Sequence, residues 1–331
     1  MFQLDNITLA VLFSVFVLLE MLYIWIAPRI GIVDVPSGRS SHSTLTIRGG
    51  GIIFPISIFI GLIVSQNSSV MDHAAWVVSG LFTISVISFI DDKYTIKPLS
   101  RLVVHILSVV LLLWGMGFDS QPWYLWLAAL VLIIGWINAF NFMDGINGIT
   151  ALYALSIIVP ALFLYSSGEY QTLLDSSIVE VGLLSVLAFG VFNIRRKART
   201  FAGDVGSVSM AFILAFILLD LMLSGYGFSI LVFFSVYGVD TVFTILTRLK
   251  KGENIFEAHR THLYQYLANE MKIPHVAVSA IYASIQLLIN LGWIGMSSNN
   301  RFSYFILVLG GLVAVYLPFK MKLVSKIRAK A

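Results

Sequence analysis

The sequence contains the polar stretch Asn138-Ala-Phe-Asn-Phe-Met-Asp-Gly-Ile-Asn-Gly148 between two long apolar runs, residues 123–137 and 149–165. Polar side chains recur in it at every third position: Asn138, Asn141, Asp144 and Asn147. Consecutive members would be neighbours on an α-helix, but the row of four would sweep about half-way round the helix axis. Because Asp144-Gly145 is also a turn signal, we expect a helix that ends here and opens into a loop. Polar groups at the end of an apolar helix are costly unless they have a function.

The composition is that of a membrane protein. The chain has 331 residues, of which 58% are hydrophobic and 11% are charged, about half the charged fraction of a soluble protein. Its apolar runs approach the ~20 residues that cross a bilayer. Because these runs are continuously apolar rather than alternating, they predict an all-α polytopic helix bundle and not a β-barrel. The absence of cysteine excludes disulfide and thiolate chemistry.

The hydropathy pattern predicts about eleven membrane spans. The first run has no basic flank and no small-residue cleavage site, so we expect a retained helix and not a signal peptide. The expected spans cover residues 7–27, 50–65, 74–90, 102–118, 123–138, 149–165, 178–193, 208–224, 228–247, 276–295 and 303–319.

The basic residues predict the orientation. Of the 21 lysines and arginines, all but Arg301 lie in one set of connections: 28–49, 91–101, 139–148, 194–207, 248–275 and 320–331. The positive-inside rule makes this set cytoplasmic, which puts the N-terminus in the periplasm and the C-terminus in the cytoplasm. We expect one catalytic transmembrane domain, residues 1–331, with its site formed by loops 28–49, 91–101, 138–148, 194–207 and 248–275.

Five polar clusters lie in these loops. In the first, Asp34–His42 and Thr46–Gly51, three successive glycines would let the backbone approach a ligand, and His42 and Arg48 would meet anionic oxygens. A glycine-rich helix start with incidental charge is the alternative. The second is Asp91-Asp92, two adjacent carboxylates that repel unless a cation sits between them. They suit a Mg²⁺ site, or else a solvated loop with a helix N-cap.

The third cluster is the opening stretch, whose asparagines suit a base or a sugar or bonds between helices. The fourth contains Asp204 in a glycine-flanked turn, which suits Mg²⁺ or an ordinary N-cap. In the fifth, His259, Arg260 and His262 suit a diphosphate. A zinc site is disfavoured there, since cysteines and a His-Glu-x-x-His pattern are absent.

Other charged groups receive simpler interpretations. Asp240 is expected to line the same cavity, and Glu20 and Asp220 to serve the bundle. We interpret His105 as a packed polar group, and the run Lys320–Lys330 as a stop at the anionic inner leaflet.

Together the clusters supply carboxylates for a metal, cations for phosphate and amides for a nucleotide. No phosphate-binding P-loop or dinucleotide-binding motif is present, and phosphoryl transfer needs mainly positioning and charge neutralisation. The alternative is a secondary transporter for an anionic metabolite, but the charges crowd one face and no repeat is visible. We expect no nucleic-acid partner.

The chain resembles the polyprenyl-phosphate N-acetylhexosamine-1-phosphate transferases, of the glycosyltransferase family 4 type. The resemblance rests on Arg48-Gly-Gly-Gly51, Asp91-Asp92, Asn138–Gly145, Phe201-Ala-Gly-Asp-Val-Gly-Ser207 and the loop 259–265. These motifs follow the order of the family from about residue 30 to residue 270.

The resemblance implies that a lipid phosphate attacks the β-phosphorus of a UDP-sugar and releases UMP. It implies that Asp204 holds Mg²⁺ (or Mn²⁺ in its place), that Asp91 and Asp92 act near the lipid phosphate, and that His42, Asn138, Asn141 and Asp144 serve the nucleotide and sugar. Arg48, His259, Arg260 and His262 would meet the diphosphate. The acceptor would be undecaprenyl phosphate, at the cytoplasmic face of the bacterial inner membrane. The sequence leaves open whether the protein is a homodimer.

Two departures from the family pattern matter. Asn147 stands where the family often has a second Asp, which weakens a metal role there. Tyr264-Gln265 replace two histidines, and His259 stands where an Asp is usual. This form is similar to the branch that initiates O-antigen, part of lipopolysaccharide, with UDP-N-acetylhexosamine donors; which donor is used stays open.

Overall fold

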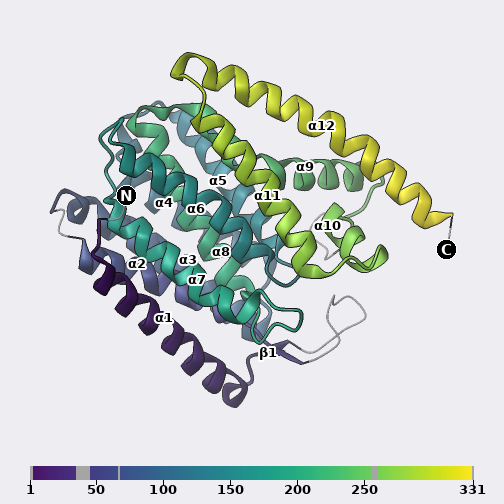
Figure 1. Ribbon diagram of the computed structural model, residues 1–331, viewed down its shortest axis with the longest axis horizontal. Coiled ribbons are helices and arrows are strands. Elements are labelled where there is room, and N and C mark those ends of the chain that lie inside the picture. Colours follow the sequence, from purple (N-terminus) through teal and green to yellow (C-terminus); the bar gives the residue numbers. More distant parts are fainter. Residues whose placement is uncertain (1–2, 35–44, 66–67, 255–258, 330–331) are drawn as a thin grey trace.

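A computed structural model describes residues 3–34, 45–65, 68–254 and 259–329. They form a bundle of helices with one two-residue strand pair (Figure 1). The α-helices are α1 Asn6–Ile26, α2 Ile53–Val64, α3 Ser68–Tyr94, α4 Pro98–Gly115, α5 Trp123–Met143, α6 Ile149–Ser167, α7 Ser176–Asn193, α8 Gly203–Leu221, α9 Ser235–Lys250, α10 Leu263–Gln265, α11 His275–Ile294 and α12 Ser298–Arg328. The 3-10 helices are η1 Ala27–Ile30, η2 Gly50–Ile52, η3 Phe118–Ser120 and η5 Phe228–Phe234. The π-helices are η4 Met222–Tyr226 and η6 Tyr266–Glu270.

The predicted membrane bundle is confirmed. In the described part of the chain, ten helices are long and apolar enough to cross a bilayer, and Gly50–Val64 is a shorter apolar helix. The twelve residues of α2 rise only about 18 Å, against a hydrocarbon core of ~30 Å. The second expected span is therefore the short one. The predicted orientation of the termini stays a prediction.

Helix α8 is the centre of the bundle. In its membrane-length window 94% of the residues are buried, against 11% in α1 and in α12. It packs against α2, α3, α5 and α6, whereas α1 and α12 lie at opposite edges of the bundle (Figure 1). A helix that is apolar all round belongs inside a bundle, so the sequence of α8 fits its place.

The strand pair fixes the chain next to the start of α8. Strands β1, Val33–Asp34, and β2, Thr46–Ile47, are antiparallel, with Val33 opposite Ile47 and Asp34 opposite Thr46. Ile47 also forms a parallel bridge with Thr200. The backbone N–H groups of Gly50 and Gly51 then donate to Phe201 O and Ala202 O. The segment that carries Arg48 is thereby held beside residues 200–202.

Candidate active site

The start of α8 is capped by a carboxylate from another helix. Its N-cap residue, Ala202, makes no side-chain cap bond. Instead the N–H of Asp204 donates to Asp92 Oδ1 at 2.8 Å and that of Val205 to Asp92 Oδ2 at 3.0 Å. Asp92 lies in the last turn of α3, because that helix runs on to Tyr94. The expected loop position of Asp91-Asp92 is therefore wrong, and so is the alternative in which the pair caps the following helix, whose N-cap is Lys97.

Asp91, Asp92, Asp204, Arg48 and Arg101 form what we call the carboxylate cluster. The Arg48 guanidinium joins Asp92 (Nε to Oδ1, 2.6 Å) to Asp204 (Nη2 to Oδ1, 3.0 Å). Arg101 Nη1 joins Asp91 Oδ2, at 2.5 Å, to Asp204 Oδ2, at 3.2 Å. Each of the adjacent carboxylates thus has its own cation, which relieves their repulsion.

Exposure separates the members that a ligand can reach. The side chains of Arg48, Arg101 and Asp204 are 33%, 22% and 16% exposed, against 5% for Asp91 and 0% for Asp92. Both oxygens of Asp92 are occupied by the backbone of α8, and one of them also by Arg48. The geometry gives Asp92 a holding role at the start of α8, and its predicted role in catalysis stays a prediction.

The glycines beside Arg48 serve close packing of the backbone. A Cβ on Gly51 would lie 2.2 Å from Gly206 Cα, and one on Gly206 would lie 2.7 Å from Gly51 Cα. Gly49 has φ +83°, a conformation that favours glycine. Gly51 approaches α8, and Gly50 approaches the side chains of Thr200 and Glu20. Both glycines pack against protein, so the expectation that they open the backbone to a ligand is not supported.

The central stretch divides between a helix and a turn. Because α5 continues to Met143, Asn138 and Asn141 are helical, which corrects the predicted span boundary. Asn138 Nδ2 donates to Ile134 O of its own helix at 2.8 Å. Asn141 Nδ2 donates to Asp204 Oδ1 at 3.2 Å and to Ser207 Oγ at 2.9 Å. Asn141 therefore belongs with the carboxylate cluster.

Beyond the helix end, Asp144 and Asn147 have different partners. Asp144 Oδ1 accepts a bond from Thr150 Oγ1 at 2.5 Å. Burial raises the pKa of Asp144 to about 6, although the bond from Thr150 lowers it. Asn147 Nδ2 donates to the carbonyls of Arg195 and Arg196, at 2.9 and 3.2 Å. Asn147 thus pins the loop between α7 and α8, in keeping with the doubt about a metal role.

Residues 259–265, which we call the histidine loop, lie against the end of α5. The ring of His262 is 1% exposed, and its Nδ1 lies 3.4 Å from Asp240 Oδ1. The rings of His259 and His262 are stacked, with centroids 5.0 Å apart, and Phe142 packs on both. Burial, with the charges of His262 and Arg248, lowers the pKa of His259 to about 4. Both His259 and Arg260 keep partial exposure, whereas His262 faces inward.

The remaining expectations divide as follows. His42 lies outside the described residues. His105 is buried, at 2% exposure, as expected. Asp220 accepts bonds from Tyr165 Oη and from the backbone of the 171–174 loop, a role in the bundle. Glu20 is buried and has no hydrogen-bond partner in the part of the chain that the structure describes.

Sequence reasoning assigned Arg101 and Lys320 only to topology. Arg101 follows the acids by about ten residues, and the need of adjacent carboxylates for a cation was the signal that pointed to it. Lys320 Nζ donates to Thr244 Oγ1 at 2.6 Å and to Tyr316 Oη at 2.7 Å, so its interpretation as part of a leaflet stop is wrong. No local signal in the sequence indicated these contacts.

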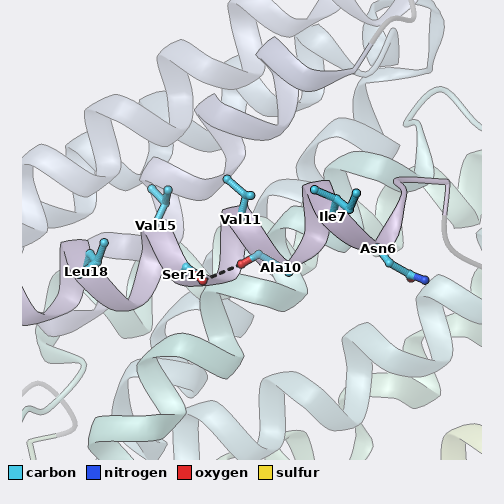
Figure 2. Close-up of a pocket in the computed structure, with 7 residues that line it drawn as sticks. All are labelled: Asn6, Ile7, Ala10, Val11, Ser14, Val15 and Leu18. Atoms are coloured by element: carbon cyan, nitrogen blue, oxygen red, sulfur yellow. Dashed lines mark hydrogen bonds between the residues drawn. The ribbon is translucent and has the colours of Figure 1, made fainter.

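An open apolar groove runs along α1 and is lined by Asn6, Ile7, Ala10, Val11, Ser14, Val15 and Leu18 (Figure 2). It contains no acid or base. It occupies the first half of α1, whereas Tyr23, near the other end, donates to Arg48 O at 2.7 Å. The groove suits lipid contact and lies apart from the carboxylate cluster.

The donor set of the cluster fits Mg²⁺. This ion takes oxygen ligands and is held by one or two carboxylates, with waters and substrate phosphate completing its shell. Three carboxylates against two guanidinium groups leave one negative charge, and Asp204 is the carboxylate that solvent reaches most. Among the described residues no group of three or more His, Asp or Glu side chains surrounds a single metal position, and a site of this kind does not need one.

Comparison with known proteins agrees with the motifs. Residues 74–222 match the family model described as Glycosyl transferase family 4. A Bacillus subtilis protein named probable undecaprenyl-phosphate N-acetylglucosaminyl 1-phosphate transferase is 28% identical over 78% of this chain and 75% of its own length. The Yersinia pestis undecaprenyl-phosphate alpha-N-acetylglucosaminyl 1-phosphate transferase is 26% identical over 82% and 78%.

This chain is also similar to a transferase with a different name. The phospho-N-acetylmuramoyl-pentapeptide-transferase of Thermotoga neapolitana is 28% identical over 75% of this chain and 84% of its own length. The matched region contains the acids of the carboxylate cluster, and the relatives extend the likeness over most of the chain. The family model and these relatives support the assignment of this chain to the polyprenyl-phosphate N-acetylhexosamine-1-phosphate transferase superfamily.

Proposed function

We propose that this protein transfers an N-acetylhexosamine-1-phosphate from a UDP-sugar to undecaprenyl phosphate. The products are undecaprenyl-diphospho-sugar and UMP. The names of the relatives support this activity class. The observation that carries the proposal is the carboxylate cluster, in which Arg48, Arg101 and Asp204 are open to a ligand and the buried Asp91 and Asp92 hold them.

A carboxylate, two guanidinium groups and the N-terminus of a helix would serve the diphosphate. Asp204, with Asp91 behind it, would hold Mg²⁺. The bound ion would act as a Lewis acid and a template for the phosphates. Arg48 and Arg101 pair with the carboxylates here and would offer their remaining N–H groups to phosphate oxygens, a charge-assisted contact. The N-terminus of α8 adds a positive dipole end beside these oxygens.

The reaction needs little covalent chemistry from the protein. An oxygen of the lipid phosphate forms a bond to the β-phosphorus of the donor, and the bond from that phosphorus to the oxygen bridging to UMP breaks. If the acceptor arrives protonated, we assign Asp91 to take the proton. Both adjacent carboxylates are bonded on both oxygens, but the side chain of Asp91 is 5% exposed and that of Asp92 is 0% exposed. Positioning and charge neutralisation supply the remainder.

The nucleotide would lie between the end of α5 and the histidine loop. Asn141, Phe142 and Asp144 border this region from the end of α5, and His259 and Arg260 border it from the histidine loop. At neutral pH His259 is uncharged, since burial, together with the charge of Arg248, lowers its pKa to about 4. It would therefore serve as a hydrogen-bonding and stacking group, while Arg260 brings the charge.

We place the protein in the inner membrane of a bacterium with this site toward the cytoplasm, where UDP-sugars are made. The Ala-His-Arg-x-His-x-Tyr-Gln form of residues 258–265 favours a donor of the N-acetylated hexosamine class and the first membrane step of O-antigen or a related surface polysaccharide.

The test is direct. The purified protein is incubated with undecaprenyl phosphate, Mg²⁺ and a panel of UDP-N-acetylhexosamines, and UMP release is followed, with donor omitted and acceptor omitted as controls. We expect UMP only when acceptor, donor and Mg²⁺ are all present, and a loss of at least a hundredfold in Asp204→Asn. No UMP with any donor overturns the function, and full activity of Asp204→Asn or in excess chelator overturns the metal assignment.

A further inference from the structure

A second buried carboxylate joins four separate parts of the chain. Asp240, on α9, accepts hydrogen bonds from Tyr282 Oη of α11 at 2.7 Å and from Tyr316 Oη of α12 at 2.8 Å. It also accepts the backbone N–H of Leu263, where α10 begins, at 3.1 Å. Lys320 Nζ of α12 lies 3.8 Å from its Oδ1. We call Asp240, His262, Tyr282, Tyr316 and Lys320 the Asp240 cluster.

Stability alone does not account for this cluster. The Asp240 side chain is 1% exposed, and that of Lys320 is 12% exposed. A buried ion pair is often no more stabilising than well-packed apolar residues of the same volume, because both charges lose their hydration. Such a group needs a further explanation, and its contacts supply one.

The contacts of Asp240 are directed at the histidine loop. Its Oδ1 holds the Leu263 N–H and lies 3.4 Å from Nδ1 of His262. The His262 ring stacks on His259, and Tyr264 Oη donates to Phe142 O at 3.0 Å, which ties the loop to the end of α5. The loop that brings His259 and Arg260 toward the candidate nucleotide region is therefore fixed from behind by one carboxylate.

Helix α12 also contributes side chains to the Asp240 cluster, which anchors the histidine loop. It lies at the edge of the bundle and packs against α9 (Figure 1). Through Tyr316 and Lys320 it reaches both Asp240 and Thr244 of α9. Lys320, the first residue of the basic C-terminal run, thus faces inward and lies beside Asp240, whose carboxylate binds the histidine loop.

We propose that Asp240 is a positioning residue for the transfer reaction, acting through His262 and Leu263, and that Tyr316 and Lys320 make the C-terminal helix part of that anchor. The inference rests on the proposed function for its kinetic readout. A second readout, the exchange of backbone amides, is independent of turnover.

The chain offers a matched control at the other end of the bundle. Asp220 is a buried acid that also accepts a tyrosine hydroxyl, Tyr165 Oη at 2.7 Å, and two loop N–H groups, of Leu173 and Leu174. It therefore shares the local chemistry of Asp240, but its loop is not the histidine loop. Asp220→Asn controls for the loss of a buried, tyrosine-bonded carboxylate as such.

The experiment compares Asp240→Asn, His262→Ala, the double variant and Asp220→Asn. Each is assayed for kcat/KM of UMP release per folded protein and for hydrogen exchange of the peptide over residues 259–265. We expect a loss of kcat/KM on the order of tenfold or more in Asp240→Asn, with no further loss when it is added to His262→Ala, because residues in one network couple. Exchange at the Leu263 amide rises in the two variants that carry Asp240→Asn, because Asp240 accepts this N–H. Asp220→Asn keeps the wild-type kcat/KM and the wild-type exchange of this peptide.

The outcomes are separable. Wild-type kcat/KM and wild-type Leu263 exchange in folded Asp240→Asn overturn the positioning role, as do independent, multiplicative losses in the double variant. If Asp240→Asn does not fold, Lys320→Met and Tyr316→Phe replace it. They are expected to show smaller losses that again vanish in the His262→Ala background, and the absence of any effect in both overturns the proposal. If the wild type itself releases no UMP, the proposed function fails while the exchange data still decide the anchor.

Discussion

Asp92→Asn separates a holding role from a chemical one. The substitution keeps the volume of the side chain, but an amide nitrogen replaces one of the two oxygens that accept N–H groups at the start of α8. One of those donors then loses its acceptor in a site where the side chain is 0% exposed. Arg48 also loses one of its two carboxylate partners. The first turn of α8, which carries Asp204, becomes less well held.

The magnitude follows from these contacts. A buried N–H left without an acceptor costs about 1–3 kcal/mol. The pairing with Arg48 adds no more than about 1 kcal/mol, because the guanidinium is one-third exposed and partly screened. The total, about 1–4 kcal/mol, corresponds to a decrease in Tm of roughly 1.5–6 °C for a chain of 331 residues.

The assay has two arms. Thermal unfolding in detergent, followed by tryptophan fluorescence, gives Tm, and UMP release against Mg²⁺ concentration gives the half-saturating level. We expect Asp92→Asn to lower Tm and to raise the Mg²⁺ concentration needed for half-maximal turnover, since Asp204 is displaced. Asp91→Asn removes a carboxylate that pairs with Arg101 and accepts none of the backbone N–H groups at the start of α8, which donate to Asp92. It is expected to lower turnover with a smaller change in Tm.

A different result would refute the reasoning. If Asp92→Asn unfolds at the wild-type temperature and yet has no turnover at saturating Mg²⁺, the carboxylate acts on the substrate and the holding role is wrong.

Three further predictions concern packing and charge. Gly51→Ala would place a Cβ 2.2 Å from Gly206 Cα and is expected to destabilise the fold by about 3 kcal/mol or more, whereas a Cβ on Gly182 would meet only one side-chain carbon, at 3.8 Å; equal Tm values for the two alanine variants would contradict the close contact. For Asp144 the folded pKa, about 6, lies above the ordinary value of 3.8, so its contribution to stability is full below pH 3.8 and is lost as the pH rises through 6. Asp144→Asn should therefore stabilise the fold at pH 7 by at most about 1–3 kcal/mol, since the side chain keeps some exposure. Denaturation curves at pH 4 should show no gain in stability. The same variant is expected to bind UDP-sugar more weakly. Asn147→Asp, which restores the acid common in the family, is expected to cost about 1–3 kcal/mol because a carboxylate has no N–H for the two carbonyls of the 194–200 loop; a variant as stable as the wild type would show that those bonds are unimportant.

The sequence predicted the membrane bundle because hydropathy is a local property. Each apolar run is long enough to be recognised by itself, and the polar motifs between the runs stand out against it. Helix ends were predicted less well: α3 and α5 both extend past the predicted spans. Asp91, Asp92 and Asn141 find polar partners on other helices and need no loop. Hydropathy does not register such partners.

The sequence by itself determined the fold class, the resemblance to a transferase family and the polar groups that gather in the site. The tertiary structure decided how those groups divide their work. Asp91 and Asp92 are adjacent in the chain and nearly identical in sequence context, yet Asp92 caps a helix whose N–H groups lie 112 and 113 positions away, and Asp91 pairs with Arg101. In the same way, Asp240 became an anchor only where α12 returns to it after 76 residues. Hydrogen bonds and ion pairs act over about 3 Å, and which groups come that close is set by the packing of the whole bundle.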